Sequence, residues 1–220
     1  MERNHSYSAL VLRTRPFGES NREAWFLTRE EGILTATVFG GPKSKFRALV
    51  SPFHQGRLWV YHQPVRDSRK LTDFDVQSWR PGIREQYQRT MTAGAVVETI
   101  LDSLGSGGNW PWASDLANGT LDALDGADEG ACIRVFIHFL WNWLLLMGLR
   151  PDGVSPDGTY GEWAVLGPGA RHWFRAVENL EPSQAVRYTL DPLSLNQAKA
   201  LTMGLMARAI GKRPASWDRL

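Results

Sequence analysis

The sequence predicts an α+β protein in which a five-stranded β-barrel is followed by an α-helical bundle. Residues 1–80 hold five short segments rich in β-branched and aromatic residues, each with alternating polar and apolar positions. From Ile83 onward, apolar residues instead recur at spacings of three and four, which is typical of helices. Pro81 and Gly82 interrupt the chain between the two patterns. We therefore expect one domain over residues 1–80 and a second over residues 81–220.

The composition is that of an ordinary globular protein. Of the 220 residues, 43% are hydrophobic and 22% are charged, so the chain can bury a sizeable core. The single cysteine, Cys132, excludes an internal disulfide and a cysteine-based zinc site, and it fits a reducing, intracellular setting. The apolar run from Val135 to Leu149 is interrupted by His138 and Asn142, which favours a buried helix over a membrane span. The first ten residues lack the apolar core of a signal peptide, so we expect a cytoplasmic protein.

Positive charge is concentrated in the first part of the chain. Residues 1–80 hold 13 Lys and Arg against 8 Asp and Glu, a net charge of +5. Residues 81–220 hold 12 against 15, a net charge of −3. A basic domain joined to a nearly neutral one predicts an anion-binding module at the N-terminus.

The five expected strands differ in how their faces are used. In the fourth, Leu58 and Val60 alternate with Arg57, Trp59 and Tyr61, so one face is apolar. In the fifth, the same alternation places Leu71 with Asp73 and Asp75, opposite Phe74 and Val76. The expected strands are Ser8 to Arg15, Glu23 to Thr28, Ile33 to Phe39, Gln55 to His62 and Leu71 to Trp79.

A longer insert, residues 40–53, separates the third and fourth strands. It begins with Gly40 and Gly41, carries Lys43, Lys45 and Arg47 at alternate positions, and ends in Pro52-Phe53. We expect Phe46, Leu49 and Phe53 to pack on the barrel. Five short strands with such an insert match the plan of the OB-fold, which binds oligonucleotides on its second and third strands and on two of its loops.

The cations fall where an OB-fold would use them. Phosphates attract ammonium and guanidinium groups, and exposed rings stack on bases. Trp59 and Tyr61 could equally fill the barrel core, and either role fits the sequence. The predicted DNA-binding residues are Arg13, Arg15, Lys43, Lys45, Arg47, Arg57, Trp59, Arg66, Arg69 and Lys70.

The second domain is predicted to be helical. We expect helices over about 83–104, 110–124, 130–148, 170–180 and 191–210, with the apolar helix 130–148 at the centre of the bundle. Asp128 and Asp191 are expected N-caps. Residues 151–169 are rich in Gly and Pro and predict a loop or hairpin, and the tail after Gly211 is polar and basic.

No catalytic motif is evident, so we expect a protein that is not an enzyme. The five histidines are scattered, and we expect His138 and Asn142 to satisfy each other or the backbone. Gly40 to Ser44 lacks the spacing of a phosphate-binding loop. Asp73 and Asp75 share a strand face, which leaves a metal-dependent hydrolase as a weak alternative. A barrel that binds a protein, with no DNA binding, is the other alternative.

The N-terminal third resembles the RecO family of bacterial recombination mediators. The resemblance covers the strand before Gly18, the turn between the second and third strands, and the insert. From about residue 105 to 200, mainly the order of helices agrees, and Arg213 to Ser216 resembles the family's closing motif. The matching residues are Gly18-Glu19-Ser20, Thr28, Glu31-Gly32, Gly40, Ser44, Phe46-Arg47, Leu49 and Pro52-Phe53.

The resemblance implies an OB-fold joined to a helical bundle, without catalytic activity. It implies a protein of DNA repair and recombination that binds single- and double-stranded DNA, anneals complementary strands and helps load the recombinase. The implied partners are the single-stranded DNA-binding protein, through its acidic C-terminal tail, and RecR, with RecF as a further candidate. For the tail we expect Arg134 as the binding cation, with Arg150 second.

Many members also carry a four-cysteine zinc module after the central helix. Here the Gly- and Pro-rich segment 151–169 stands at that place and contains no cysteine. We therefore expect no zinc and no other cofactor.

Overall fold

A computed structural model describes residues 4–41, 43–103, 108–151, 163 and 165–220. The chain divides into two compact units. The first comprises residues 1–81 together with 108–118, and the second comprises residues 82–107 and 119–220.

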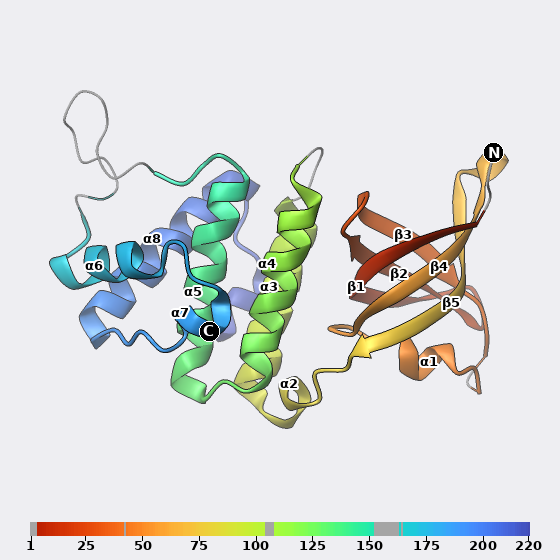
Figure 1. Cartoon of the computed structure of the whole chain (residues 1–220), viewed down its shortest axis with the longest axis horizontal. Coiled ribbons are helices and arrows are strands. Elements are labelled where there is room, and N and C mark those ends of the chain that lie inside the picture. Colours follow the sequence, from red (N-terminus) through yellow and green to blue (C-terminus); the bar gives the residue numbers. More distant parts are fainter. Residues whose placement is uncertain (1–3, 42, 104–107, 152–162, 164) are drawn as a thin grey trace. The chain divides into compact units, whose positions relative to one another are not determined.

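The first unit is a closed barrel of five strands, as the sequence predicts (Figure 1). The strands follow the order β1-β2-β3-β5-β4 around the barrel. All pairs are antiparallel except β3 with β5, which is parallel and aligns Thr37 with Lys70. The strands are β1 (Asn4–Phe17), β2 (Asn21–Thr28), β3 (Gly32–Val38), β4 (Gln55–Gln63) and β5 (Ser68–Ser78).

Side chains at alternate positions along the strands point inward and fill the barrel interior. Leu58 and Val60 of β4 are fully buried, as the alternation predicts, and Arg57 and Trp59 are exposed, which decides the position of Trp59 that the sequence left open. Leu71 departs from its predicted face, because the register of β4 and β5 shifts between Trp59 and Val60. This β-bulge leaves an extra residue in β5 and turns Leu71 into the core cluster. A strict period of two cannot reveal such a bulge.

The insert between β3 and β4 forms a short helix, α1 (Phe46–Leu49), at one end of the barrel (Figure 1). Phe46 and Leu49 pack against the barrel core, and Val50 is buried within it, in agreement with the predicted packing. Phe53 is only partly buried and has a positive φ of 76°. Its carbonyl accepts a hydrogen bond of 2.6 Å from Arg80.

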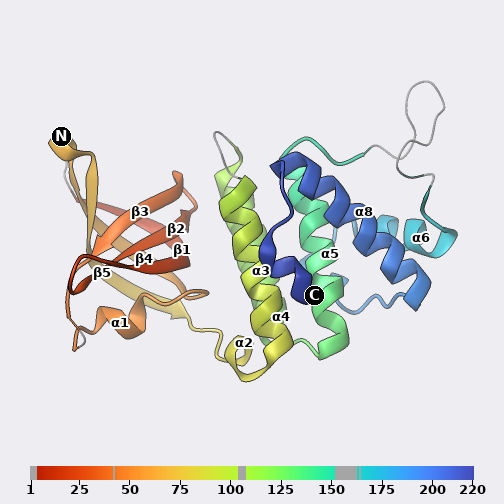
Figure 2. The same ribbon diagram turned by 180° about the vertical axis from the view of Figure 1, so that it is seen from behind.

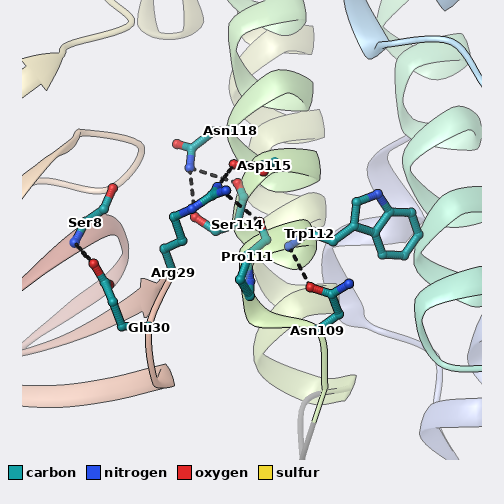
Figure 3. Close-up of polar contacts among 9 residues, drawn as sticks. All are labelled: Ser8, Arg29, Glu30, Asn109, Pro111, Trp112, Ser114, Asp115 and Asn118. Carbon is teal, nitrogen blue, oxygen red and sulfur yellow. Dashed lines mark hydrogen bonds and ion pairs between the residues drawn. The ribbon is translucent and has the colours of Figure 1, made fainter.

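The first turns of α4 (Trp110–Asp125) belong to the barrel's unit. Gly32 has a φ of +77°, and a Cβ placed there would lie 2.6 Å from the ring of Trp110, so only glycine fits. Arg29 forms an ion pair with Asp115 and donates to the carbonyl of Pro111 at 3.4 Å (Figure 3). In the same view, Glu30 accepts from the backbone N–H of Ser8 at 3.0 Å.

The second unit is a helical bundle in which α5 lies between α3 and α8 (Figure 2). Twelve residues of α5 are buried, which agrees with its prediction as the central helix. The helix expected over about 83–104 is divided into α2 and α3, and the short α7 was not foreseen. The remaining helices of this unit lie within a few residues of their predicted bounds. The helices are α2 (Gly82–Glu85), α3 (Tyr87–Ser103), α5 (Glu129–Leu146), α6 (Pro168–Val177), α7 (Pro182–Ala185) and α8 (Pro192–Ile210).

Caps and the tail complete this bundle. Asp128 accepts from the N–H of Ala131 at 2.7 Å, and Asp191 accepts from the N–H of Ser194 at 3.0 Å, so both predicted N-caps are confirmed. The basic tail is not simply solvated. It forms the short helix η3 (Ala215–Arg219), whose Trp217 is buried against Phe136.

The Gly- and Pro-rich segment predicted at 151–169 lies largely outside the described residues. Trp163, which is described, is buried and donates to the carbonyl of Pro151 at 3.1 Å. Among the described residues, no helix is long and apolar enough to span a membrane.

Candidate nucleic-acid interface

The outer surface of β1, β2 and β3 gathers rings and cations from separate parts of the sequence. Arg13 pairs with Trp25 across β1 and β2, and Trp25 pairs with Thr35 of β3. Directly paired residues point to the same side of a sheet. Because Thr14 pairs with the buried Ala24, its neighbours Arg13 and Arg15 must face outward. We call this surface the β1–β3 face, made up of Arg13, Arg15, Phe17, Trp25, Thr35, Thr37, Phe39 and Lys70.

Trp25 is the centre of the β1–β3 face. The guanidinium carbon of Arg15 lies 4.9 Å from the centroid of its ring, and that of Arg13 lies 5.8 Å away. Both distances fit cation–π contacts. The ring is partly buried, and both arginines are exposed. An anion approaching Trp25 would therefore meet two cations first.

Two exposed phenylalanines flank one end of this face. Phe17, at the end of β1, has 48% of its surface exposed, and Phe39, just after β3, has 46% exposed. Phe17 pairs with Asn21 of β2, whose side chain accepts from the N–H of Gly40 at 3.4 Å, so both rings lie beside the start of β2. The ammonium of Lys70 lies 5.5 Å from the ring of Phe39.

One acid lies within this group of cations. Glu23 pairs with Arg15 across β1 and β2, and its carboxylate lies 2.6 Å from the Arg15 guanidinium. The β1–β3 face thus has three cations, Arg13, Arg15 and Lys70, beside a single carboxylate. A net positive charge remains.

The outer surface of β4 and β5 is more evenly charged. Arg57 pairs with Asp75 and Trp59 pairs with Asp73 across the two strands. Lys45 reaches from the insert to Asp73 at 3.2 Å. We call this surface the β4–β5 face, made up of Lys45, Arg57, Trp59, Asp73 and Asp75. Trp59 is 37% exposed, so it lies outside the barrel core, and two cations face two acids around it.

The remaining predicted DNA-binding residues are dispersed. Lys43 and Arg47 are exposed on the insert. Burial, with Arg47 nearby, lowers the pKa of Arg22, whose guanidinium donates to the carbonyl of Phe46 at 2.8 Å. Arg69 lies 3.9 Å from Glu31 at the end of the barrel. The side chain of Arg66, in the turn η1 (Pro64–Arg66), lies outside the described part of the structure.

The two predicted partner-binding cations occupy different settings in the helical unit. Arg150 is 15% exposed, lies 2.6 Å from Glu178 and stacks over Trp141 at 5.4 Å, so its charge is matched inside the unit. Arg134 is half-buried and donates to the carbonyls of Gly130 and Val186, at 2.8 and 3.4 Å.

A separate groove lies along α8. It has a volume of about 390 Å³, and its lining combines apolar residues with one glutamine and one arginine. The sequence did not indicate this groove, because the spacing of its apolar residues along α8 is also typical of a helix face that packs in the core. The lining residues are Val165, Gln197, Ala200, Leu201, Gly204 and Arg208.

The histidine on the central helix has a structural environment. Burial lowers the pKa of His138 to about 4, so the ring is neutral at physiological pH. The side-chain amide of Asn142 lies 3.1 Å from its Nε2 atom, which confirms the predicted pairing. Among the described residues, no group of three or more His, Cys, Asp and Glu side chains is placed to hold a metal ion.

Sequence reasoning assigned the cations of the β1–β3 face but missed its rings. Trp25, Phe17 and Phe39 lie on three different segments and become neighbours only through the register of the sheet. Alternation within the second strand was the one signal available in the sequence. Trp59, the ring that was chosen, lies on the β4–β5 face.

The first 78 residues match the family model described as recombination protein O, N-terminal. This match spans the whole barrel, from before β1 to the end of β5. The barrel of this chain is therefore similar to the N-terminal domain of the RecO family. The model confirms the resemblance seen in the sequence and agrees with the OB-fold order of the strands.

Relatives extend the similarity beyond the barrel. A DNA repair protein RecO of Salinibacter ruber is 32% identical over 99 residues, which are 44% of this chain and 37% of that protein. The RecO protein of Thermosynechococcus vestitus is 25% identical over 154 residues, or 69% and 54% of the two chains. The RecO protein of Rubrobacter xylanophilus is 28% identical over 167 residues, or 73% and 66%. The chain thus spans between about a third and two thirds of these relatives.

Proposed function

We propose that this chain is a DNA-binding protein of repair and recombination that acts without catalysing a reaction. The observation that carries the proposal is the β1–β3 face, where Arg13, Arg15 and Lys70 surround partly exposed rings. Barrels of this topology bind oligonucleotides around their second and third strands and on the loops that join strands one-two and four-five. Both single- and double-stranded DNA present phosphates to these cations.

Such a surface would favour the annealing of complementary strands. Cations that hold phosphates without reading bases lower the repulsion between two strands and leave their base edges free to pair. The net charge of +5 over residues 1–80 supports this mode of binding. The cations Lys43, Lys45 and Arg47 of the insert remain candidates for a further contact, although Lys45 is paired with Asp73.

The helical unit would supply the protein contacts. Loading of the recombinase requires access to strands coated by the single-stranded DNA-binding protein, whose C-terminal tail is acidic and apolar. The groove along α8 supports binding of that tail, because it combines apolar walls with Arg208. RecR, with RecF as a further candidate, would complete the set of partners, in the cytoplasm at the nucleoid.

The alternative of a hydrolase finds no support at the acids that suggested it. Asp73 is paired with Lys45 at 3.2 Å, and Asp75 lies opposite Arg57. Neither carboxylate belongs to a metal-ligating group among the described residues. A third ligand would be required for the two-metal chemistry that these acids suggested.

Charge reversal on the β1–β3 face tests the proposal. We expect the triple variant Arg13→Glu, Arg15→Glu and Lys70→Glu to weaken binding of a labelled single strand and to lower the slope of log affinity against log salt by about 2, since each phosphate contact contributes about 0.7. Fluorescence anisotropy over a salt series measures both quantities.

A matched control reverses exposed cations elsewhere. Arg175→Glu with Arg187→Glu changes the net charge in the same direction in the helical unit, where both residues are exposed, and should leave the slope nearly intact. An unchanged slope in the triple variant would contradict the proposed site. Absence of salt-dependent binding by the unaltered chain would favour a barrel that binds a protein.

A further inference from the structure

The rings on the β1–β3 face do more than the proposed electrostatic binding requires. Phe17 and Phe39 each expose nearly half of their surface, at 48% and 46%. An exposed aromatic ring loses hydrophobic burial, and phosphate binding gains nothing from it. Together with Trp25, these side chains place three rings on a single outer surface of the barrel.

Each of two rings also has a cation beside it. Lys70 lies 5.5 Å from the ring of Phe39, and Arg15 lies 4.9 Å from the ring of Trp25. A nucleotide consists of a flat base and a charged phosphate, so a ring beside a cation matches both of its parts. The β1–β3 face has two such pairs, Arg15 with Trp25 and Lys70 with Phe39.

Stacking on protein rings requires bases that are not already stacked in a duplex. In double-stranded DNA the base faces are covered by their neighbours, and only edges and phosphates remain accessible. The cations of the β1–β3 face can serve both forms of DNA, whereas the rings can serve the single strand alone. On the β4–β5 face two acids, Asp73 and Asp75, lie beside Trp59 and its cations, whereas Glu23 is the single acid described among the cations of the β1–β3 face.

We infer that Phe17, Phe39 and Trp25 form a base-stacking platform that makes the barrel select unpaired strands over duplex, with little dependence on sequence. The inference rests on the proposed DNA binding and adds its substrate class. On this surface the cations would supply affinity for any DNA, and the rings would supply the preference for single strands over duplex.

The double variant Phe17→Ala with Phe39→Ala tests the platform. Both side chains are exposed, so the fold should be retained, and a matched thermal unfolding curve checks this. We expect affinity for a mixed-sequence single strand to fall by roughly tenfold or more, in line with the loss of stacking. Affinity for a duplex of equal length should stay within about twofold of that of the unaltered chain, because every cation is retained. For the same reason, the slope of log affinity against log salt should change little for either form of DNA.

Phe17→Trp with Phe39→Trp serves as the conservative variant and should preserve the preference for single strands. Equal losses for both forms of DNA in the alanine variant, or no loss for either, would overturn the platform while leaving DNA binding in place. If the unaltered chain bound neither form in a salt-dependent way, the proposed function itself would fail. The two failures are therefore distinguishable.

Discussion

Glu23 sets the charge of the β1–β3 face at the level of a single residue. Its carboxylate holds Arg15 at 2.6 Å and draws the guanidinium toward β2. Exposed ion pairs of this kind contribute little to stability, because water screens them and the side chains lose freedom. Their effect on an approaching anion is larger, since the pair removes one cation from the field of the face.

Replacing this acid should therefore improve DNA binding. We expect Glu23→Gln to tighten single-strand binding and to raise the salt slope by about 0.7, the contribution of one additional phosphate contact. Thermal unfolding should change little, because the lost pair is exposed. Asp75→Asn, which removes an acid from the β4–β5 face, is the matched control. Equal gains in both variants would show that net charge alone, and not this face, governs affinity.

Single residues also mark the limits of sequence reasoning. The cations Arg13, Arg15 and Lys70 were identified from their loop and strand positions alone. Trp25 was not among the predicted DNA-binding residues, because a sequence gives the face of a residue within its own strand but not its neighbours across the sheet. Leu71 was assigned to the wrong face for a related reason, since the bulge opposite Trp59 and Val60 breaks the alternation.

At the scale of elements, the type and order of the strands and long helices could be predicted from the sequence, but the contacts between elements could not. Alternation identified the five strands, and the spacing of apolar residues identified the long helices with their caps at Asp128 and Asp191. The short α7 and the docked helix η3 were missed. Trp217 lies in a basic, polar tail, and its packing against Phe136 of α5 explains why it is buried.

The groove along α8 yields a prediction about this element. Gly204 is exposed, and a Cβ built there meets no atom within 4 Å, so Gly204→Leu should fill the groove without a clash. Leucine is also the better helix former, so stability should not fall. We expect this variant to weaken binding of the coating protein's acidic tail peptide by roughly tenfold, and Arg208→Glu to do the same by charge repulsion.

Calorimetric titration with the tail peptide measures these losses, and Arg134→Ala serves as the comparison. Arg134, on α5, was the cation expected from the sequence. A loss with Arg134→Ala and none with Gly204→Leu would place the tail on α5 and contradict docking along α8.

At the scale of the whole molecule, charge and fold divide in the same way. The basic part of the sequence folds into the barrel, and the slightly acidic part supplies most of the helical unit. The sequence pattern places the boundary at residues 80–81, but residues 108–118, which include the first turns of α4, belong to the barrel's unit as well. No local sequence pattern predicts that residues 108–118 join the barrel's unit, because this depends on contacts such as those of Trp110 with Gly32 and of Arg29 with Asp115.

Photo-crosslinking tests most directly whether the β1–β3 face holds the single strand. A single strand that carries 5-iodouracil is bound to the unaltered chain and irradiated, and the crosslinked peptides are identified by mass spectrometry. We expect crosslinks at Phe17, Trp25 or Phe39, because stacked bases place the reactive carbon against these rings. Crosslinks confined to Trp59 and Tyr61 of β4 would contradict this placement of the DNA.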